Sequence, residues 1–193
     1  MLFRSLDIRN FTAFARSRAP QDVVDYLNSV FAFMIEAIDR HRGIINKFLG
    51  DGFIAIFGAP LDDPQAVRGA VSAAREILAE IDRRGLDKAT WPLRVGIGIH
   101  TGSVVTGNVG SPRRKEYTVI GDVVNLAARL EQATKEYGAR LLVSATVAER
   151  LGDELGPAVP VGPVAVKGYE TPVPAWQLDP IAPPPGQGAG VSL

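Results

Sequence analysis

Two aspartates stand where their carboxylates could bind a divalent cation. Asp7 lies at the end of an expected strand over residues 2–8, and Asp51 lies in the Gly-Asp-Gly turn of an expected hairpin. In an antiparallel sheet that pairs this strand with the hairpin, the two carboxylates converge on one point. Together they would supply the hard oxygen ligands that Mg²⁺ or Mn²⁺ prefers. Each also has an ordinary interpretation: Asp-Gly is a common turn sequence, whereas Asp is depleted in strands, which makes Asp7 the more unusual of the two.

Four further polar side chains are candidates for nucleotide binding. Asn125 and Arg129 lie one turn apart on the polar side of an expected helix, where an amide could hold a ribose and a guanidinium could neutralise a phosphate. The same spacing is typical of a solvated helix face. Lys47 and Thr118 each stand in strand-like sequence, and each taken alone is an ordinary surface residue.

The segments that would position these residues alternate between strand and helix patterns. Apolar residues recur at helical spacing over residues 21–42, over residues 62–85 and after Asp122. The third of these helices is expected to turn inward Val123, Leu126, Ala127, Leu130, Thr134 and Tyr137. Strand-like runs occupy residues 2–8, 44–49, 53–57, 93–100, 104–109, 140–143, 161–166 and 175–178. This order favours an α+β, ferredoxin-like (palm-type) fold, with a mostly antiparallel sheet and the helices packed on one face.

The length of the chain is suited to one domain. Its 193 residues can close a single sizeable core, which we expect to be formed within residues 1–179. Residues 180–193 are rich in Pro and Gly and poor in core-forming side chains, so we expect a flexible tail there. Because Met1 lies directly before the first strand, we expect the full-length protein to have an upstream regulatory domain.

Composition excludes several classes of site and partner. Without cysteine the chain has no disulfides or thiolate zinc sites, and its two histidines, His41 and His100, stand far apart in sequence. Lys and Arg balance Asp and Glu at 21 each, so no basic field predicts nucleic-acid binding. No apolar run is long enough to cross a bilayer. We therefore expect a cytoplasmic domain with a small-molecule partner and no direct membrane contact, although the full-length protein could be membrane-attached.

Longer motifs give a more specific prediction than any single residue. The chain reads Leu-Phe-x-x-x-Asp-Ile-Arg-Asn-Phe-Thr, then Asn-Lys-Phe-Leu-Gly-Asp-Gly, then Gly-Ile-His-Thr-Gly, then Tyr-Thr-Val-Ile-Gly-Asp-Val-Val-Asn-Leu-Ala-Ala-Arg-Leu-Glu. In this order and spacing, over roughly residues 2–178, the sequence resembles the class III adenylyl and guanylyl cyclase domain, especially its bacterial branch.

The resemblance implies a role for each matching residue. Asp7, Asp51 and the backbone carbonyl of Ile8 would bind two divalent cations, Mg²⁺ or Mn²⁺. The segment containing Asn10, Phe11 and Thr12 would wrap the phosphates, and Lys167 would bind phosphate as well. Asn125 and Arg129 would form the pair that stabilises the transition state.

The family's purine-selecting pair matches Lys47 and Thr118. A lysine ammonium can donate to N1 of adenine and a threonine hydroxyl can accept from its amine, whereas guanine would leave both mispaired. Guanylyl members of the family usually carry Glu and Cys at these positions. The pair therefore favours ATP, with a neutral acceptor at Thr118 where animal adenylyl cyclases carry Asp.

The resemblance implies an adenylate cyclase, a phosphorus–oxygen lyase in signal transduction. The ribose 3′-oxygen would attack the α-phosphorus in line, and ATP would become 3′,5′-cyclic AMP and pyrophosphate with the help of two metal ions. The metal aspartates would come from one subunit and the other site residues from its partner, which predicts a homodimer with two equivalent sites. The alternatives are a guanylyl cyclase and a non-catalytic nucleotide-binding regulatory module.

Overall fold

A computed structural model describes residues 2–89, 91–165 and 172–178, except the side chains of residues 2–4 and 117. In this part of the chain, seven strands form one sheet in the order β2-β3-β1-β4-β7-β9-β8. Their bounds are β1 Leu2–Ile8, β2 Gly43–Leu49, β3 Gly52–Phe57, β4 Val95–Thr101, β7 Leu141–Ser144, β8 Val159–Val164 and β9 Val173–Gln177. Neighbouring strands run antiparallel except β4 and β7, which are parallel. The expected α+β fold with a mostly antiparallel sheet is confirmed.

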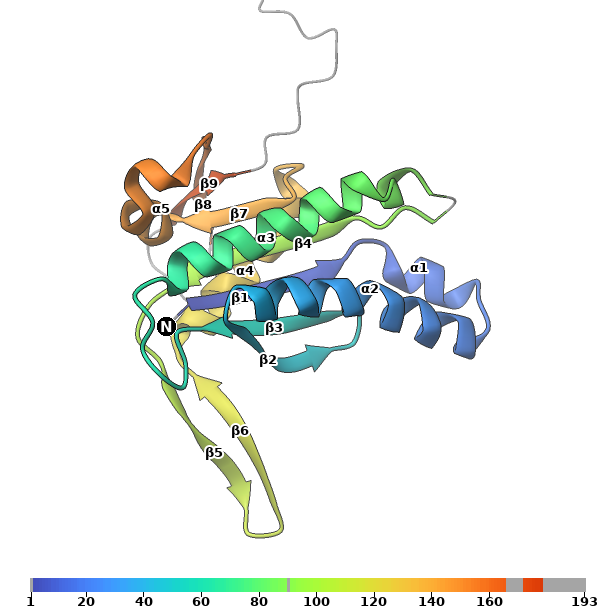
Figure 1. The fold of residues 1–193 in the computed structure, drawn as a ribbon, viewed down its shortest axis with the longest axis horizontal. Coiled ribbons are helices and arrows are strands. Elements are labelled where there is room, and N and C mark those ends of the chain that lie inside the picture. The colour runs from blue at the N-terminus through green and yellow to red at the C-terminus, as the bar shows by residue number, and fades with distance from the viewer. Residues whose placement is uncertain (1, 90, 166–171, 179–193) are drawn as a thin grey trace, which may run out of the picture.

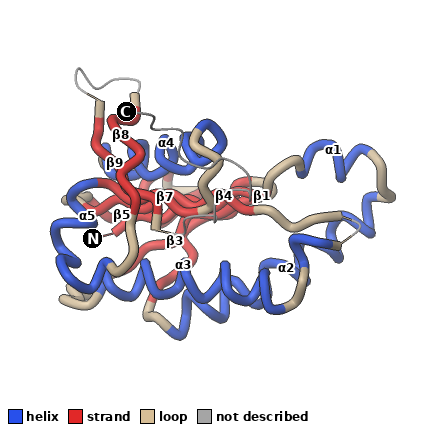
Figure 2. Tube along the Cα trace, turned by 90° about the horizontal axis from the view of Figure 1, so that it is seen from above, coloured by secondary structure: helices blue, strands red, loops and turns tan. Residues whose placement is uncertain are grey.

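Two long helices cover one face of this sheet. They are α2, Pro20–Arg40, and α3, Ala66–Arg83. Pro20 stands at the start of α2, where its fixed φ suits a helix and its missing N–H costs nothing. The core between the two helices and the sheet includes Met34, Ile38, Phe53, Phe57, Ala70, Ile77, Ile97 and Ile99. Figure 2 shows both helices on the same side of the strands.

A third long helix, α4, Asp122–Glu136, lies on the opposite face (Figures 1 and 2). The expectation of helices on one face therefore holds for α2 and α3, and α4 corrects it. Successive side chains of β4 explain the arrangement, because Val95, Ile97 and Ile99 join the core beneath α2 and α3 while Gly96 and Gly98 lie against α4. Tyr137, which we expected to turn inward from α4, is instead 37% exposed.

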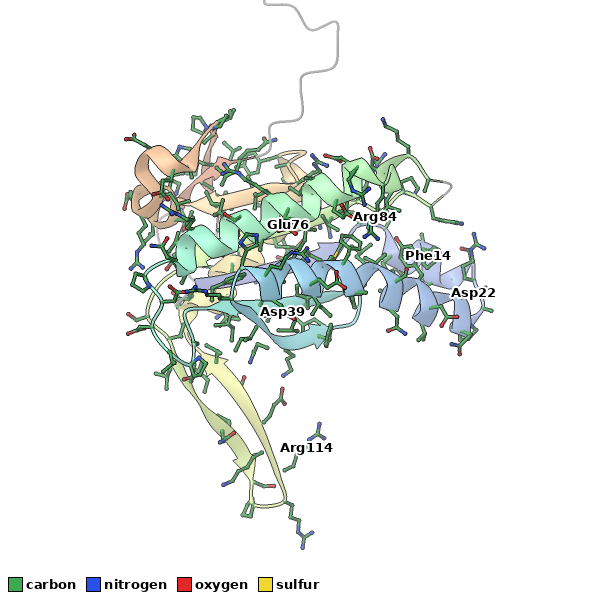
Figure 3. The ribbon with its side chains drawn as sticks, in the orientation of Figure 1. Phe14, Asp22, Asp39, Glu76, Arg84 and Arg114 are labelled. Atoms are coloured by element: carbon green, nitrogen blue, oxygen red, sulfur yellow. The ribbon has the colours of Figure 1, made fainter. Side chains whose placement is uncertain are left out.

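A separate two-stranded hairpin extends away from the sheet. It consists of β5, Val105–Ser111, and β6, Arg114–Ile120, and Figure 1 shows it projecting from the body of the molecule. Arg114 lies toward its far end (Figure 3). The hairpin exposes the apolar side chains of Val105, Val109 and Ile120.

Four short helices complete the described part of the chain. They are α1, Phe11–Arg16, α5, Ala145–Leu151, and the 3₁₀-helices η1, Leu86–Lys88, and η2, Gly152–Leu155. In the described residues, no helix combines the length and apolar character needed to span a bilayer.

The two outer strands of the large sheet are both irregular. Edge strand β8 contains Pro160 and Pro163, and its pairing with β9 shifts register between Pro160 and Gly162. The other edge strand, β2, shifts register against β3 between Ile45 and Lys47.

Candidate active site

The pairing of β1 with β3 brings the two aspartates together. Asp7 lies opposite Gly52 in the β1–β3 register, and the amide of Ile8 donates to the carbonyl of Asp51 at 3.3 Å. This close approach requires glycine at position 52, because a Cβ there would lie 2.2 Å from the carbonyl oxygen of Leu6. The strand end and the hairpin turn thus lie side by side, and the metal site that they would form stays a prediction.

The electrostatic surroundings of Asp7 suit a bound cation. Burial raises the pKa of its carboxyl above the ordinary value, and the negative charge of Asp51 raises the pKa further. Two neighbouring cations act in the opposite direction: Nη1 of Arg9 lies 3.3 Å from Oδ2 of Asp7, and Nζ of Lys135 lies 3.9 Å from it. A divalent cation between the two carboxylates would relieve their mutual repulsion.

The donor set at this site fits magnesium or manganese. Asp7 and Asp51 provide hard carboxylate oxygens, and the family resemblance implies the backbone carbonyl of Ile8 as a third oxygen ligand. Mg²⁺ is commonly bound through one or two carboxylates, with substrate phosphates and waters completing its shell. Among the described residues, no three His, Cys, Asp or Glu side chains gather into a fuller cage, so the remaining ligands would have to come from substrate and water.

The segment after Asp7 turns sharply into α1. Asn10 has φ 61° and ψ 19°, in the left-handed region that Asn tolerates better than most residues. Its carbonyl accepts from the amides of Ala13 and Phe14 at 3.1 and 3.3 Å. Phe11 packs partly against the core, and Thr12 is exposed. The three residues expected to wrap phosphates therefore directly follow the carboxylate site, at the start of α1.

Asn125 and Arg129 lie on α4, away from the carboxylates of their own chain. Asn125 is exposed, and Nη1 of Arg129 donates to Oε1 of Gln132 at 2.8 Å on the helix surface. The α4 residues near Asp7 are Lys135, 3.9 Å from it, and Glu131, which is joined to it through Arg9. They stand ten and six positions beyond Asn125, which corresponds to about 15 and 9 Å along a helix axis. A single chain does not bring these two halves of the expected site together.

Of the two purine-selecting candidates, Lys47 contacts β6, the strand that carries Thr118, through an ion pair with Glu116. Lys47 on β2 forms an ion pair with Glu116 on β6, with 2.8 Å between Nζ and Oε1. The hydrogen bond from Lys47 lowers the pKa of the Glu116 carboxyl. Thr118 follows Glu116 by two positions on β6 and therefore points to the same side of that strand. The ion pair of Lys47 with Glu116 therefore places Lys47 of β2 beside the side of β6 that carries Glu116 and Thr118.

Lys167, the last candidate, lies outside the described residues. Three residues at the site were not predicted from sequence: Arg9, Glu116 and Glu131. Arg9, directly after β1, forms an ion pair with Glu131 of α4, with 2.8 Å between Nη1 and Oε1. The sequence could have indicated Glu131, because this acidic residue stands between Ala127 and Thr134 within the inward-facing stripe of its helix.

Solved nucleotide cyclases share this architecture. The adenylyl cyclase CyaB of P. aeruginosa superimposes with a TM-score of 0.77 at 28% identity, over 94% of each chain. The guanylyl cyclase Cya2 superimposes with a TM-score of 0.74 at 34% identity, over 96% of this chain and 94% of that one. The family model described as the adenylate and guanylate cyclase catalytic domain matches residues 1–179. The chain therefore belongs to this family, the class III nucleotidyl cyclases.

A curated relative is considerably longer than this chain. An uncharacterized protein of Mycobacterium tuberculosis is 41% identical over 169 residues, covering 87% of this chain but 30% of the relative. The chain thus spans about 30% of the length of that relative.

Proposed function

We propose that this cyclase domain is an adenylyl cyclase that converts ATP to 3′,5′-cyclic AMP and pyrophosphate at two sites shared across a homodimer. The observation that carries the proposal is the division of the site within one chain. Asp7 and Asp51 meet at one end of β1, while Asn125 and Arg129 face outward from α4. A two-fold symmetric pair would let the carboxylates of each chain meet the α4 surface of the other.

The residues of the chain divide the work of cyclisation. Asp7, Asp51 and the Ile8 carbonyl would hold two divalent cations, which when bound neutralise the triphosphate and make the ribose 3′-hydroxyl more acidic. Arg129 of the partner subunit would donate to the α-phosphoryl oxygens as negative charge develops there. Asn125 of the partner subunit would hold the ribose with its 3′-oxygen directed at phosphorus.

The phosphates beyond the reacting centre need their own partners. Backbone and side-chain donors of Asn10, Phe11 and Thr12, directly after Asp7, would bind them. Lys167 would add a positive charge. Both assignments follow the family motif.

The choice of adenine rests on Lys47 and Thr118. An ammonium has three donors, and the ion pair with Glu116 occupies one of them, which leaves donors free for N1 of adenine. The Thr118 hydroxyl can accept from the adenine amine. Guanine presents a donor and an acceptor at the corresponding positions, so both contacts would be mispaired.

A second candidate substrate is GTP. The guanylyl cyclase Cya2 is 34% identical to this chain, compared with 28% for the adenylyl cyclase CyaB, so overall similarity does not favour ATP. The side chains of Lys47 and Thr118 support ATP despite that similarity. The regulatory region expected upstream and the cytoplasmic location stay predictions.

The test is cyclic nucleotide production from ATP and from GTP, with Mg²⁺ and with Mn²⁺, over a wide range of protein concentration. Cyclic AMP formation with a specific activity that rises with concentration is expected. Formation of cyclic GMP from GTP in excess of cyclic AMP from ATP would favour the guanylyl alternative. Absence of any product at high concentration with Mn²⁺ would favour a non-catalytic regulatory module.

Complementation between inactive chains tests the shared site directly. Asp51→Ala and Arg129→Ala should each lower turnover by roughly a hundredfold or more, since each removes an electrostatic group at the reacting centre. When the two variants are mixed, a heterodimer would contain one intact site, so activity should return to as much as about a quarter of the wild-type value if chains exchange at random. A mixture as inactive as its components, although chain exchange is verified, would refute the shared site.

A further inference from the structure

Arg9 is held between two carboxylates on different elements. It follows β1, and its side chain is 12% exposed, beneath α4. Nη1 donates to Oδ2 of Asp7 at 3.3 Å, and it lies 2.8 Å from Oε1 of Glu131 in an ion pair without an aligned hydrogen bond. The guanidinium is thus shared between a candidate metal ligand and an acidic residue of the helix.

The α4 side of this cluster is built to hold the guanidinium. Nη2 of Arg9 donates to the backbone carbonyl of Glu131 at 3.0 Å and also contacts Oγ1 of Thr134. Thr134, itself 1% exposed, donates to the same Glu131 carbonyl at 2.6 Å. The Glu131 residue is 6% exposed. Buried acidic residues of this kind are rare unless paired, and the cation facing this one is Arg9.

The opposite wall of the cluster is formed by the sheet. A Cβ at position 96 would lie 1.5 Å from Nη2 of Arg9, so glycine at that position of β4 leaves the space that the guanidinium fills. The arginine therefore occupies a fitted site between β4 and α4, from which Nη1 still donates one hydrogen bond of 3.3 Å to Oδ2 of Asp7.

We propose that the Glu131 carboxylate holds the Arg9 guanidinium against α4 and so limits its hold on Asp7 to one long contact, which leaves the Asp7 carboxylate able to bind a divalent cation. Glu131 and Arg9 are then positioning residues, since they act on the cation through Asp7. The inference rests on the proposed function, in which Asp7 binds metal.

The physical reason is competition for one carboxylate. A guanidinium and a carboxylate form a strong two-point pair, and such a pair occupies the oxygens that a metal ion would use. With Glu131 present, the closer anion to Nη1 of Arg9 is Glu131. Glu131→Gln removes that charge but keeps the shape, so Arg9 would turn to Asp7. Lys135, 3.9 Å from Asp7, is unchanged by this substitution.

The experiment measures Mn²⁺ binding to the nucleotide-free protein by calorimetry and by the loss of free Mn²⁺ signal in electron paramagnetic resonance. Glu131→Gln should weaken Mn²⁺ binding about tenfold or more, the size typical of residues that orient a metal ligand. Arg9→Gln/Glu131→Gln should return the affinity to within about threefold of wild type, because the competing cation is gone. A residue that merely supported the helix would not show this rescue.

Two further variants keep the outcome decisive. Glu76→Gln is the matched control, because it removes an Arg–Glu pair between α3 and α2 on the other face of the sheet (Figure 3), and its Mn²⁺ affinity should equal that of wild type. Arg9→Gln alone should bind Mn²⁺ at least as tightly as wild type. Thermal unfolding of each variant confirms that the folded protein is being compared.

The results that would overturn the inference are distinct from those that would overturn the metal site. Asp7→Asn should abolish Mn²⁺ binding, and binding that survives in this variant would refute the proposed site and this inference together. If Asp7→Asn abolishes binding but the double variant binds as weakly as Glu131→Gln, the inference alone is wrong. Weaker binding by Arg9→Gln than by wild type would also refute it.

Discussion

Gly52→Ala should damage both the stability of the domain and its carboxylate site. The added methyl would lie 2.2 Å from the Leu6 carbonyl oxygen, so β1 and β3 would have to separate locally by about 1 Å to reach an ordinary contact distance. Overpacking of this kind costs about 1–3 kcal/mol. Weakening the hydrogen bond from Ile8 to Asp51 adds about 1 kcal/mol. The total is about 2–4 kcal/mol, so at about 2–4 °C per kcal/mol for a domain of this size the melting temperature should fall by about 4–16 °C.

The same displacement should reduce activity beyond the loss of folded protein. Asp7 and Asp51 stand on the two strands that must separate, and a misplacement of about 1 Å can cost roughly a hundredfold in turnover. Thermal unfolding and cyclase activity, measured well below the melting temperature, test the two effects separately. Gly107→Ala is the stability control, since a Cβ there meets nothing within 4 Å, and its melting temperature should stay within about 2 °C of wild type. A Gly52→Ala protein with wild-type melting temperature and activity would refute the reasoning.

Two further predictions concern single side chains. Burial lowers the pKa of His100 from 6.5 to about 4, so the contribution of the neutral imidazole to stability is present above about pH 6.5 and is lost as the pH falls toward 4. Between pH 7 and pH 4.5, the melting temperature of His100→Gln should therefore drop less than that of wild type. An equal drop in the two proteins would count against this prediction. Lys47→Met should lower kcat/KM for ATP by about 10-fold to 100-fold, which is the value of a hydrogen bond to a charged group, and should lower kcat/KM for GTP less. Steady-state kinetics with both nucleotides measure this. An unchanged ratio of kcat/KM for ATP to kcat/KM for GTP would show that Lys47 does not select the purine.

The long amphipathic helices and most strands of the large sheet follow from sequence patterns. The apolar spacing over residues 21–42 and 62–85 predicted α2 and α3 to within a few residues, because each stripe is long enough to define a helical period. Helix α1 spans six residues, too few to show that period. A stripe also does not say which face of a sheet it covers, so the position of α4 required the structure.

The candidate site was predicted only in part. The turn sequence predicted the hairpin that carries Asp51, whereas the position of Asp7 beside it depends on the non-local pairing of β1 with β3, which the sequence analysis assumed. The contacts of Arg9 with Glu131 and of Lys47 with Glu116 join segments far apart in the chain, and no local pattern encodes such pairs. An acidic residue within the inward stripe of α4 was the one local sign that a buried cation lies opposite.

The irregular edges of the large sheet limit how two copies of the chain can associate. A proline has no amide hydrogen, so Pro160 and Pro163 leave edge strand β8 without the regular row of donors that an added strand would need. At the other edge, the irregularity in β2 disturbs the same row, and Lys47 places a charge there. Growth of the sheet from chain to chain is therefore disfavoured at both ends. Two copies that associate would then have to use side chains and helix surfaces rather than a shared sheet.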